Sequence, residues 1–220
     1  MDRQIIQAII TLSMVFGIVF QAQSQSQDWE ANAQKKVDTL IKKNGPGTDV
    51  ILQKRLLEMI EEDQAIRRKL FQAPSDKEKE LQKSLEAVDR KLTEELKEII
   101  QKHGWPTIRL VGIKASQAAA TILNHSVDHD FQRELIPELT KMVEQDEIVG
   151  SDIPSIIDKL LLSEGKPQLF GTVFRFEGEF MIMEPVKDPE HIDKRRAQYL
   201  IPPMEEYIKM MEEVYNKKLK

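Results

Sequence analysis

The chain of 220 residues contains no cysteine. This absence excludes disulfide bonds, thiolate catalysis, cysteine-based metal sites and lipid attachment at an N-terminal cysteine. Aromatic residues are also few, at 6%, and no cluster of Lys and Arg is interleaved with them. Nucleic-acid binding therefore has little electrostatic support. Without disulfides, the fold must depend on its hydrophobic core, which a chain of this length can supply.

Long hydrophobic runs are missing too, apart from the 16-residue stretch IIQAIITLSMVFGIVF near the N-terminus. This run is shorter than the about 20 residues that a membrane-spanning helix needs. It follows MDRQ and precedes QAQS, which is the order of a secretory signal peptide. We predict a signal peptide over residues 1–24, cleaved after Ser24 or Ala22, and hence a secreted or periplasmic protein of bacterial type with no stable membrane span after cleavage. An uncleaved anchor is the alternative, because Asp2 weakens the positively charged start.

What remains is rich in Leu, Ile, Glu and Lys, and it predicts one domain of the mainly α (α+β) class with six or seven helices. A polar linker with a possible short helix is expected over residues 25–48, and the helical domain over residues 49–220. Apolar residues recur at steps of three and four over residues 49–72 and again between Ser75 and Gly104. The short break between these two runs predicts a long antiparallel helix hairpin. Further helices are expected over residues 115–128, 130–146 and 151–165 and after residues 188 and 202.

The hydrophobic period changes in LFGTVFRFEGEFMIME, residues 169–184. Aromatic and polar residues alternate there, and Glu177-Gly178 reads as a turn. This pattern predicts a β-hairpin near the C-terminal third of the chain. Because an isolated hairpin is only marginally stable in water, its aromatic face is expected to pack against the helices.

Two histidines four residues apart, His125 and His129, are the first candidates for chemistry. On one helix they would face the same way, as two imidazoles that share a metal ion do. The metalloprotease pattern H-E-x-x-H is absent, since Ser126 stands in the place of the glutamate. We interpret His125 as a half-buried, hydrogen-bonded residue and His129 as solvated at the helix end, with zinc binding as the alternative. No metal site is assigned. No nucleotide-binding motif or other cofactor signal is present either.

Other polar residues allow two interpretations each. Asp63 and Arg67 have the spacing of an ordinary surface ion pair on a helix, or with Gln64 they could line a pocket. Gln168, in GKPQLFGT, is either displayed at the entrance to the hairpin or bound to backbone groups there. Arg195, within KRR, is either part of a solvated face or part of an anion clamp.

These motifs together resemble an uncharacterised bacterial family known only as a domain of unknown function. The resemblance runs from about Leu52 to Tyr207. It rests on DQAIR (63–67), GWPT (104–107), NH (124–125), DK (158–159), GKPQLFGTV (165–173) and RR (195–196) ahead of LIPP (200–203). The chain departs from the family pattern at Asn124, Lys159, Phe170 and Val173, where the family has Gln, Arg, Tyr and Gln. The family has no established reaction, so the resemblance implies a site without naming its use.

We therefore predict a shared polar pocket with His125 as the candidate acid–base group, because no other group in the set titrates near neutral pH. The ligand-binding candidates are Asp63, Gln64, Arg67, Trp105, Thr107, Gln168 and Arg195. The expected function is an extracytoplasmic binding or interaction module for a small molecule, peptide or glycan. The alternative is an extracytoplasmic hydrolase that uses His125. The lack of a nucleophile motif and of paired carboxylates favours binding.

Overall fold

The computed structural model describes residues 26–74 and 76–220. The predicted signal peptide, residues 1–24, and both of its cleavage positions lie outside the described residues. Within the part of the chain that is described, no helix is long and apolar enough to cross a membrane.

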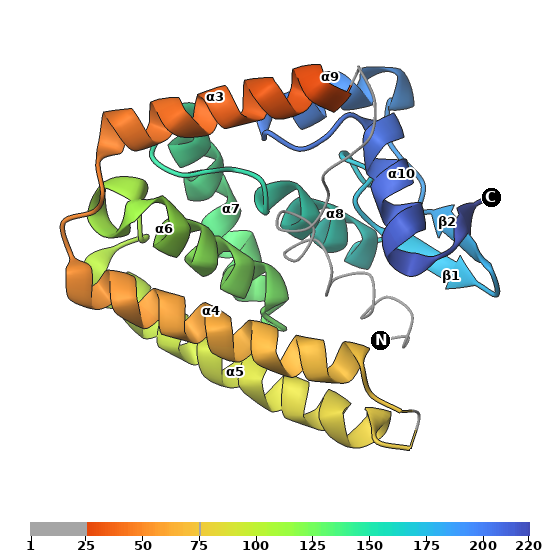
Figure 1. Ribbon diagram of the computed structural model, residues 1–220, viewed down its shortest axis with the longest axis horizontal. Coiled ribbons are helices and arrows are strands. Elements are labelled where there is room, and N and C mark those ends of the chain that lie inside the picture. The colour runs from red at the N-terminus through yellow and green to blue at the C-terminus, as the bar shows by residue number, and fades with distance from the viewer. Residues whose placement is uncertain (1–25, 75) are drawn as a thin grey trace. The chain divides into compact units, whose positions relative to one another are not determined.

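The described chain is mainly helical, with eight α-helices and a small three-stranded sheet near the C-terminus (Figure 1). This confirms the predicted class: seven of these helices, α4 to α10, lie in the predicted domain, and α3 lies in the predicted linker. Its contacts form two compact units. We call residues 38–152 the helical unit, and residues 153–220 together with the chain up to Val37 the hairpin unit.

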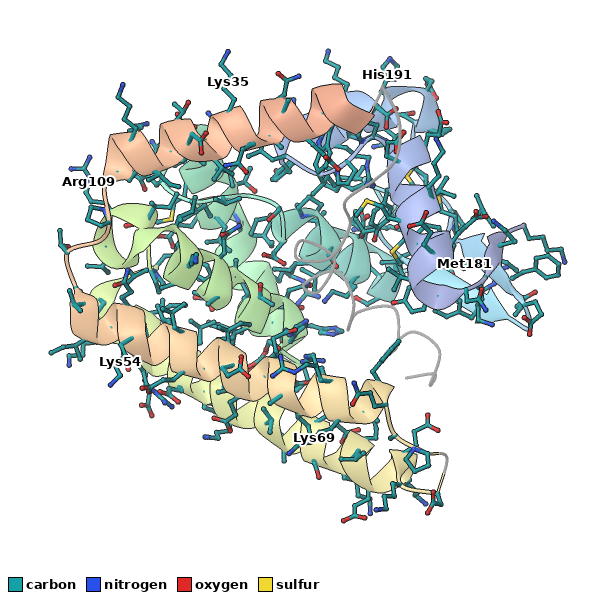
Figure 2. The ribbon with its side chains drawn as sticks, in the orientation of Figure 1. Lys35, Lys54, Lys69, Arg109, Met181 and His191 are labelled. Atoms are coloured by element: carbon teal, nitrogen blue, oxygen red, sulfur yellow. The ribbon has the colours of Figure 1, made fainter. Side chains whose placement is uncertain are left out.

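The first described helix, α3 (Ser26–Asn44), differs from the sequence expectation of a polar linker with a short helix. Half-buried or buried residues recur along it at Trp29, Ala33, Val37 and Leu40, at steps of three and four. The polar residues between them conceal this stripe in the sequence. Lys35 lies on the opposite face and extends into solvent (Figure 2).

Two long helices, α4 (Val50–Phe71) and α5 (Glu78–His103), form the predicted antiparallel hairpin of the helical unit (Figure 1). α4 begins where the carboxylate of Asp49 accepts a hydrogen bond from the backbone N–H of Leu52, at 2.9 Å. Three ion pairs cross the hairpin and fix the register of the two helices: Arg55–Glu95, Lys91–Glu62 and Arg67–Asp89.

The third helix of this unit, α6 (Ile108–His125), contacts both α4 and α5. It begins seven residues earlier than the expected 115, at the Thr107 cap, and its path breaks at Gly112, which has φ 76° and ψ 162°. The break lets the NGPG turn before α4 pack against it. A Cβ on Gly112 would lie 2.5 Å from the carbonyl oxygen of Pro46 and 2.6 Å from Nε2 of Gln53.

A fourth helix, α7 (His129–Glu144), completes the helical unit and continues through Pro137. The turn after α7 is tied to the end of α3. There, Lys43 Nζ donates to the carbonyl oxygen of Gln145 at 2.8 Å, and Asn44 Nδ2 donates to that of Asp146 at 2.9 Å.

The hairpin unit begins with α8 (Ile153–Ser163), followed by β1 (Phe174–Glu177) and β2 (Phe180–Met183). Gly178, with φ 57°, occupies the turn between the two strands. The antiparallel register pairs Phe174 with Met183 and Glu177 with Phe180. The predicted β-hairpin is therefore confirmed, and a third strand, β3 (Lys218–Leu219), joins β2 in parallel.

A 3₁₀ turn, η1 (Pro189–His191), leads into two helices, α9 (Ile192–Gln198) and α10 (Met204–Tyr215), whose buried residues pack against this sheet. The sheet contributes two phenylalanines and Met181, which lies against α10 (Figure 2). The core of the hairpin unit consists of Phe174, Phe176, Met181, Ile192, Met204, Tyr207 and Met211.

The close approach at Gly112 makes a direct test of the fold. Gly112→Ala should lower the free energy of unfolding, because the added Cβ meets Pro46 and Gln53 and the positive φ is strained in an L-residue. Gly104→Ala is the matched control, since Gly104 has φ 73° and ψ −173° but nothing within 4 Å of its Cβ position. Urea denaturation should show Gly112→Ala to be less stable than Gly104→Ala by about 1–3 kcal/mol, the usual cost of overpacking. Equal losses would contradict the close packing.

Candidate functional site

Four charged or titratable side chains are buried together in the helical unit. Asp63 and Arg67 come from α4, Asp89 from α5 and His125 from the last position of α6. Their residues are 1%, 2%, 9% and 5% exposed, respectively. Buried charges persist in proteins when they are paired, and these four are bonded to one another. We call them the charged network.

The network grows directly out of the helical stripes. α4 buries Leu52, Leu56, Met59, Asp63, Arg67 and Leu70, at steps of three and four. Asp63 and Arg67 therefore continue the apolar stripe of α4, and Asp89 does the same on α5 between Leu85 and Leu92. Because regular helices carry these positions, the backbone fixes where the charges meet.

Arg67 is the centre of the network. Its Nη2 lies 3.0 Å from Oδ1 of Asp63, and its Nε lies 3.2 Å from each oxygen of the same carboxylate. The same Nη2 also donates to Oδ1 of Asp89. One guanidinium therefore joins a carboxylate of its own helix to a carboxylate of α5.

Asp63 links this pairing to α6. Its Oδ1 lies 2.9 Å from Nδ1 of His125, and its Oδ2 accepts a hydrogen bond from Nε2 of Gln64 at 2.7 Å. Because an ionised carboxylate only accepts hydrogen bonds, Nδ1 carries the proton in this contact. Gln64 is half-buried, so among these five side chains it is the most exposed.

The environment keeps Asp63 ionised. Burial by itself would raise the pKa of its carboxyl, but the charges and hydrogen bonds of His125 and Arg67 hold that pKa well below its usual range. Asp63 is thus a permanent acceptor at neutral pH, and it fixes the orientation of the imidazole.

The end of α6 is held by α7 rather than by its own continuation. Nε2 of Gln132 donates to the carbonyl oxygens of Leu123 at 2.8 Å and of Ser126 at 3.2 Å. α7 then starts at His129, with Asp128 as its cap. His125 and His129 therefore lie on different helices, and the common helix that the zinc alternative needed is absent; α6 ends at His125, three residues before the expected 128. Across residues 26–74 and 76–220, no group of three or more His, Cys, Asp or Glu side chains is placed to hold a metal ion.

Of the two sequence interpretations of Asp63 and Arg67, burial excludes the surface ion pair, because both residues are buried. The signal was present, since positions 59, 63, 67 and 70 keep the spacing of the buried stripe. Asp89, the second carboxylate on Arg67, was missed altogether, although it stands in the corresponding stripe of α5.

Trp105 and Thr107 serve the turn between α5 and α6. The hydroxyl of Thr107 caps α6 by accepting a hydrogen bond from the backbone N–H of Leu110, at 3.3 Å. Trp105 is 3% exposed, and its buried Nε1–H makes no hydrogen bond with any described residue. In the part of the chain that is described, no hydrogen bond joins these two residues to the charged network.

Gln168 belongs to the hairpin unit and is fully buried. Its Oε1 accepts from the backbone N–H of Val173 at 3.0 Å, and its Nε2 donates to the carbonyl oxygens of Val173 at 3.1 Å and Glu184 at 2.7 Å. Of the two interpretations of Gln168, the geometry favours the one in which it satisfies backbone groups.

Asp158 organises the same loop, residues 165–173, although no role was predicted for it from the DK motif. Its carboxylate accepts hydrogen bonds from the backbone N–H groups of Leu169, Phe170 and Thr172 and from the hydroxyl of Thr172. Burial raises the pKa of Asp158, and these hydrogen bonds lower it without fully offsetting the burial. The Asp in the DK motif therefore shapes the loop.

The two arginines at the end of α9 also bind backbone carbonyls. Arg195 donates to Leu169 at 2.8 Å, to Lys187 at 2.7 Å and to Asp188 at 3.0 Å. Arg196, which is fully buried, donates to Pro202 and Phe170. Arg195 therefore positions the loop entering the hairpin instead of lying on an open solvated face.

Phe170 and Val173, which depart from the resembled family pattern, contribute to this loop through their backbones. The N–H of Phe170 binds Asp158 and its carbonyl oxygen binds Arg196, while both backbone groups of Val173 bind Gln168. The Phe170 side chain packs edge-on against Tyr199, with ring centroids 5.1 Å apart. A change of side chain at either position therefore leaves the hydrogen bonds of the loop in place.

Of the predicted site residues, the structure joins Asp63, Gln64, Arg67 and His125, and it adds Asp89. Chemically, this group offers an imidazole whose Nδ1 is held by an ionised carboxylate, beside a guanidinium shared by two carboxylates. Such a set can position hydrogen-bond partners rigidly, and an imidazole oriented in this way can also transfer a proton.

Comparison with known proteins assigns most of the chain to one protein family. The model of DUF6624, described as a family of unknown function, matches residues 50–220. This confirms the predicted resemblance to a family of that kind. No curated protein and no solved structure matches the chain.

The depressed pKa of Asp63 predicts how stability depends on pH. Its folded pKa lies below the unfolded value of about 3.9, so its contribution is present above about pH 4 and is lost as the pH falls toward the folded pKa. Asp63→Asn should therefore cost about 3 kcal/mol at pH 7, and the difference from wild type should shrink below about pH 4. Urea denaturation across this range measures it. Asp130→Asn, whose side chain is 97% exposed, should change little at any pH; a pH-independent Asp63→Asn deficit would contradict the assignment.

Proposed function

The chain belongs to DUF6624, a family of unknown function, and from its own residues we propose that it is an extracytoplasmic binding module. The ligand meets the charged network at Gln64. The ligand classes that suit this site are a small polar molecule, a peptide or a glycan.

The observation that carries the proposal is the burial of three ionic side chains and a histidine together in the core of the helical unit. Removing each charge from water costs several kcal/mol, and apolar residues of similar volume often stabilise a core as well or better. Stability alone therefore gives no reason for Asp63, Arg67 and Asp89 to be where they are. We attribute them to recognition.

Rigidity supports the same function. Each charge of the network is bonded to another member, so the group is organised before a ligand arrives, and little entropy is lost on binding. Gln64 is oriented by its bond to Asp63. A primary amide carries two N–H donors and a carbonyl acceptor, and this combination matches peptide groups and sugar hydroxyls, which also both donate and accept.

A second candidate, an extracytoplasmic hydrolase, is favoured by one specific contact. The 2.9 Å bond between Nδ1 of His125 and Asp63 is the arrangement in which a carboxylate orients an imidazole for acid–base work. In this function His125 would exchange a proton through Nε2. Binding remains our first proposal because a ligand can reach Gln64 directly, whereas the side chain of His125 is only 1% exposed.

The extracytoplasmic location is part of the proposal and rests on the sequence. The order of charged start, apolar run and small residues over residues 1–24 is that of a signal peptide.

The binding function is tested by screening the purified chain against peptides, oligosaccharides and small polar molecules. A ligand that binds the folded state raises the melting temperature, and calorimetry then gives its affinity. Gln64→Ala should weaken that affinity by about tenfold, the value of one or two lost hydrogen bonds. Gln101→Ala, at an exposed position of α5, is the matched control and should bind as wild type does.

The same screen separates the two functions through His125→Asn. Asparagine retains an N–H donor toward Asp63 but removes the ring that would carry the proton. If wild type turns over a bound compound, the turnover by His125→Asn is the deciding measurement. A loss of about 10²-fold or more with affinity unchanged would replace the binding proposal by the hydrolase. Affinity that is indifferent to Gln64→Ala would place the site elsewhere.

The proposed location predicts the N-terminus of the mature protein. Mass spectrometry of the chain recovered from its natural host should show a start at Gln25 or Gln23, in an extracytoplasmic fraction. Val15→Arg interrupts the apolar run and should keep the full-length chain inside the cell. A 25.5 kDa chain retained in the membrane fraction would instead establish the uncleaved anchor.

A further inference from the structure

The buried arginine of the hairpin unit, Arg196, carries an inference that is independent of the proposed function. Its residue is fully buried. Nε donates to the carbonyl oxygen of Pro202 at 2.5 Å, and Nη1 donates to that of Phe170. The guanidinium carbon stands 4.5 Å from the centre of the Tyr207 ring. The guanidinium is thus held on three sides.

The remaining nitrogen of this guanidinium, Nη2, differs from the other two in its hydrogen bonding. Nη2 is buried and has no hydrogen-bond partner among residues 26–74 and 76–220. It carries two N–H donors, and buried donors in native proteins almost always bind an acceptor, either in the protein or in an ordered water molecule. The atom therefore points to a bound group.

The nearby carboxylates are already occupied. Asp158 accepts hydrogen bonds from three backbone N–H groups and from the Thr172 hydroxyl. Asp193 accepts from the backbone N–H of Met204 at 2.7 Å. Neither carboxylate is hydrogen-bonded to Arg196. The acceptor on Nη2 is therefore an additional group.

Charge decides the nature of that group. Asp158 and Arg196 are both buried in the hairpin unit, and together they are neutral. A buried anion on Nη2 would leave this pair with a net negative charge, which is costly in an apolar interior. A neutral acceptor avoids this cost.

We propose that Nη2 of Arg196 binds one ordered water molecule inside the hairpin unit. A buried water usually makes about three hydrogen bonds. It accepts from Nη2 and donates to carbonyl oxygens around the guanidinium, since those of Phe170 and Pro202 each have a second lone pair. The water thus joins Arg196 to both chain segments that the arginine already holds.

The charge of the arginine adds to its need for an acceptor. Burial lowers the pKa of Arg196 to about 10, against the opposing influence of Tyr207, Asp193 and Asp158. The guanidinium is therefore still charged at neutral pH, and its unsatisfied donors require a strong acceptor there.

A crystal structure of the wild-type chain tests the proposal directly. We expect one well-ordered density peak at about 2.7–3.2 Å from Nη2, and no anomalous signal at that peak after soaking in bromide. A bromide signal there would show an anion site and overturn the proposal. So would a protein acceptor on Nη2, or the absence of any peak.

Solution measurements give a second test without crystals. Relaxation dispersion of ¹⁷O counts the water molecules that stay bound for long times. Arg196→Met should lose one of them, whereas Tyr207→Phe, which removes only the hydroxyl bonded to Thr172, should retain it. An unchanged count in folded Arg196→Met would overturn the proposal. If that variant does not fold, the wild-type crystal structure decides.

Discussion

The guanidinium of Arg67, held between Asp63 and Asp89, is the interaction on which the helical unit depends. It joins α4 to α5, and through Asp63 it reaches His125 at the end of α6. Each of these carboxylates is tolerable in the core because Arg67 is there. Without it, two buried negative charges would face each other, and breaking a buried pair in this way costs about 3–5 kcal/mol. The orientation of His125 follows from the same pairing, since Asp63 must be ionised to hold its ring.

The hairpin unit applies related chemistry to a different partner. Asp158, Gln168 and Arg196 are also buried, but they bind backbone N–H and carbonyl groups of the loop that enters the hairpin. A loop has no ladder of its own to satisfy these groups. Polar side chains from α8 and α9 supply the missing partners. The loop that leads into β1 therefore has a fixed path, although the strands themselves are short.

The sequence predicted the elements with a long, regular period. The α4–α5 hairpin and the β-hairpin follow from apolar spacing of three to four and of two, respectively. The missed members of the charged network have one cause: polar residues in positions that the stripe assigns to the core. For Asp63 and Arg67 the sequence left a surface ion pair open beside the pocket, because isolated charges usually lie at the surface, and Asp89 was overlooked for the same reason. The boundary between His125 and His129 depends on Gln132 and Asp128, which are brought to the helix end only by tertiary structure.

The two sets of buried polar residues differ in what they explain. Asp158 and Gln168 define the path of a loop, and apolar side chains cannot replace them there because the backbone groups would lose their partners. Asp63, Arg67 and Asp89 are bonded to one another on regular helices, whose backbones are already satisfied. Apolar residues can hold three helices together equally well. A structural role accounts for the hairpin-unit residues. The charged network also joins three helices, but apolar residues often do this equally well, which is the physical reason for placing the candidate site around Asp63 and His125.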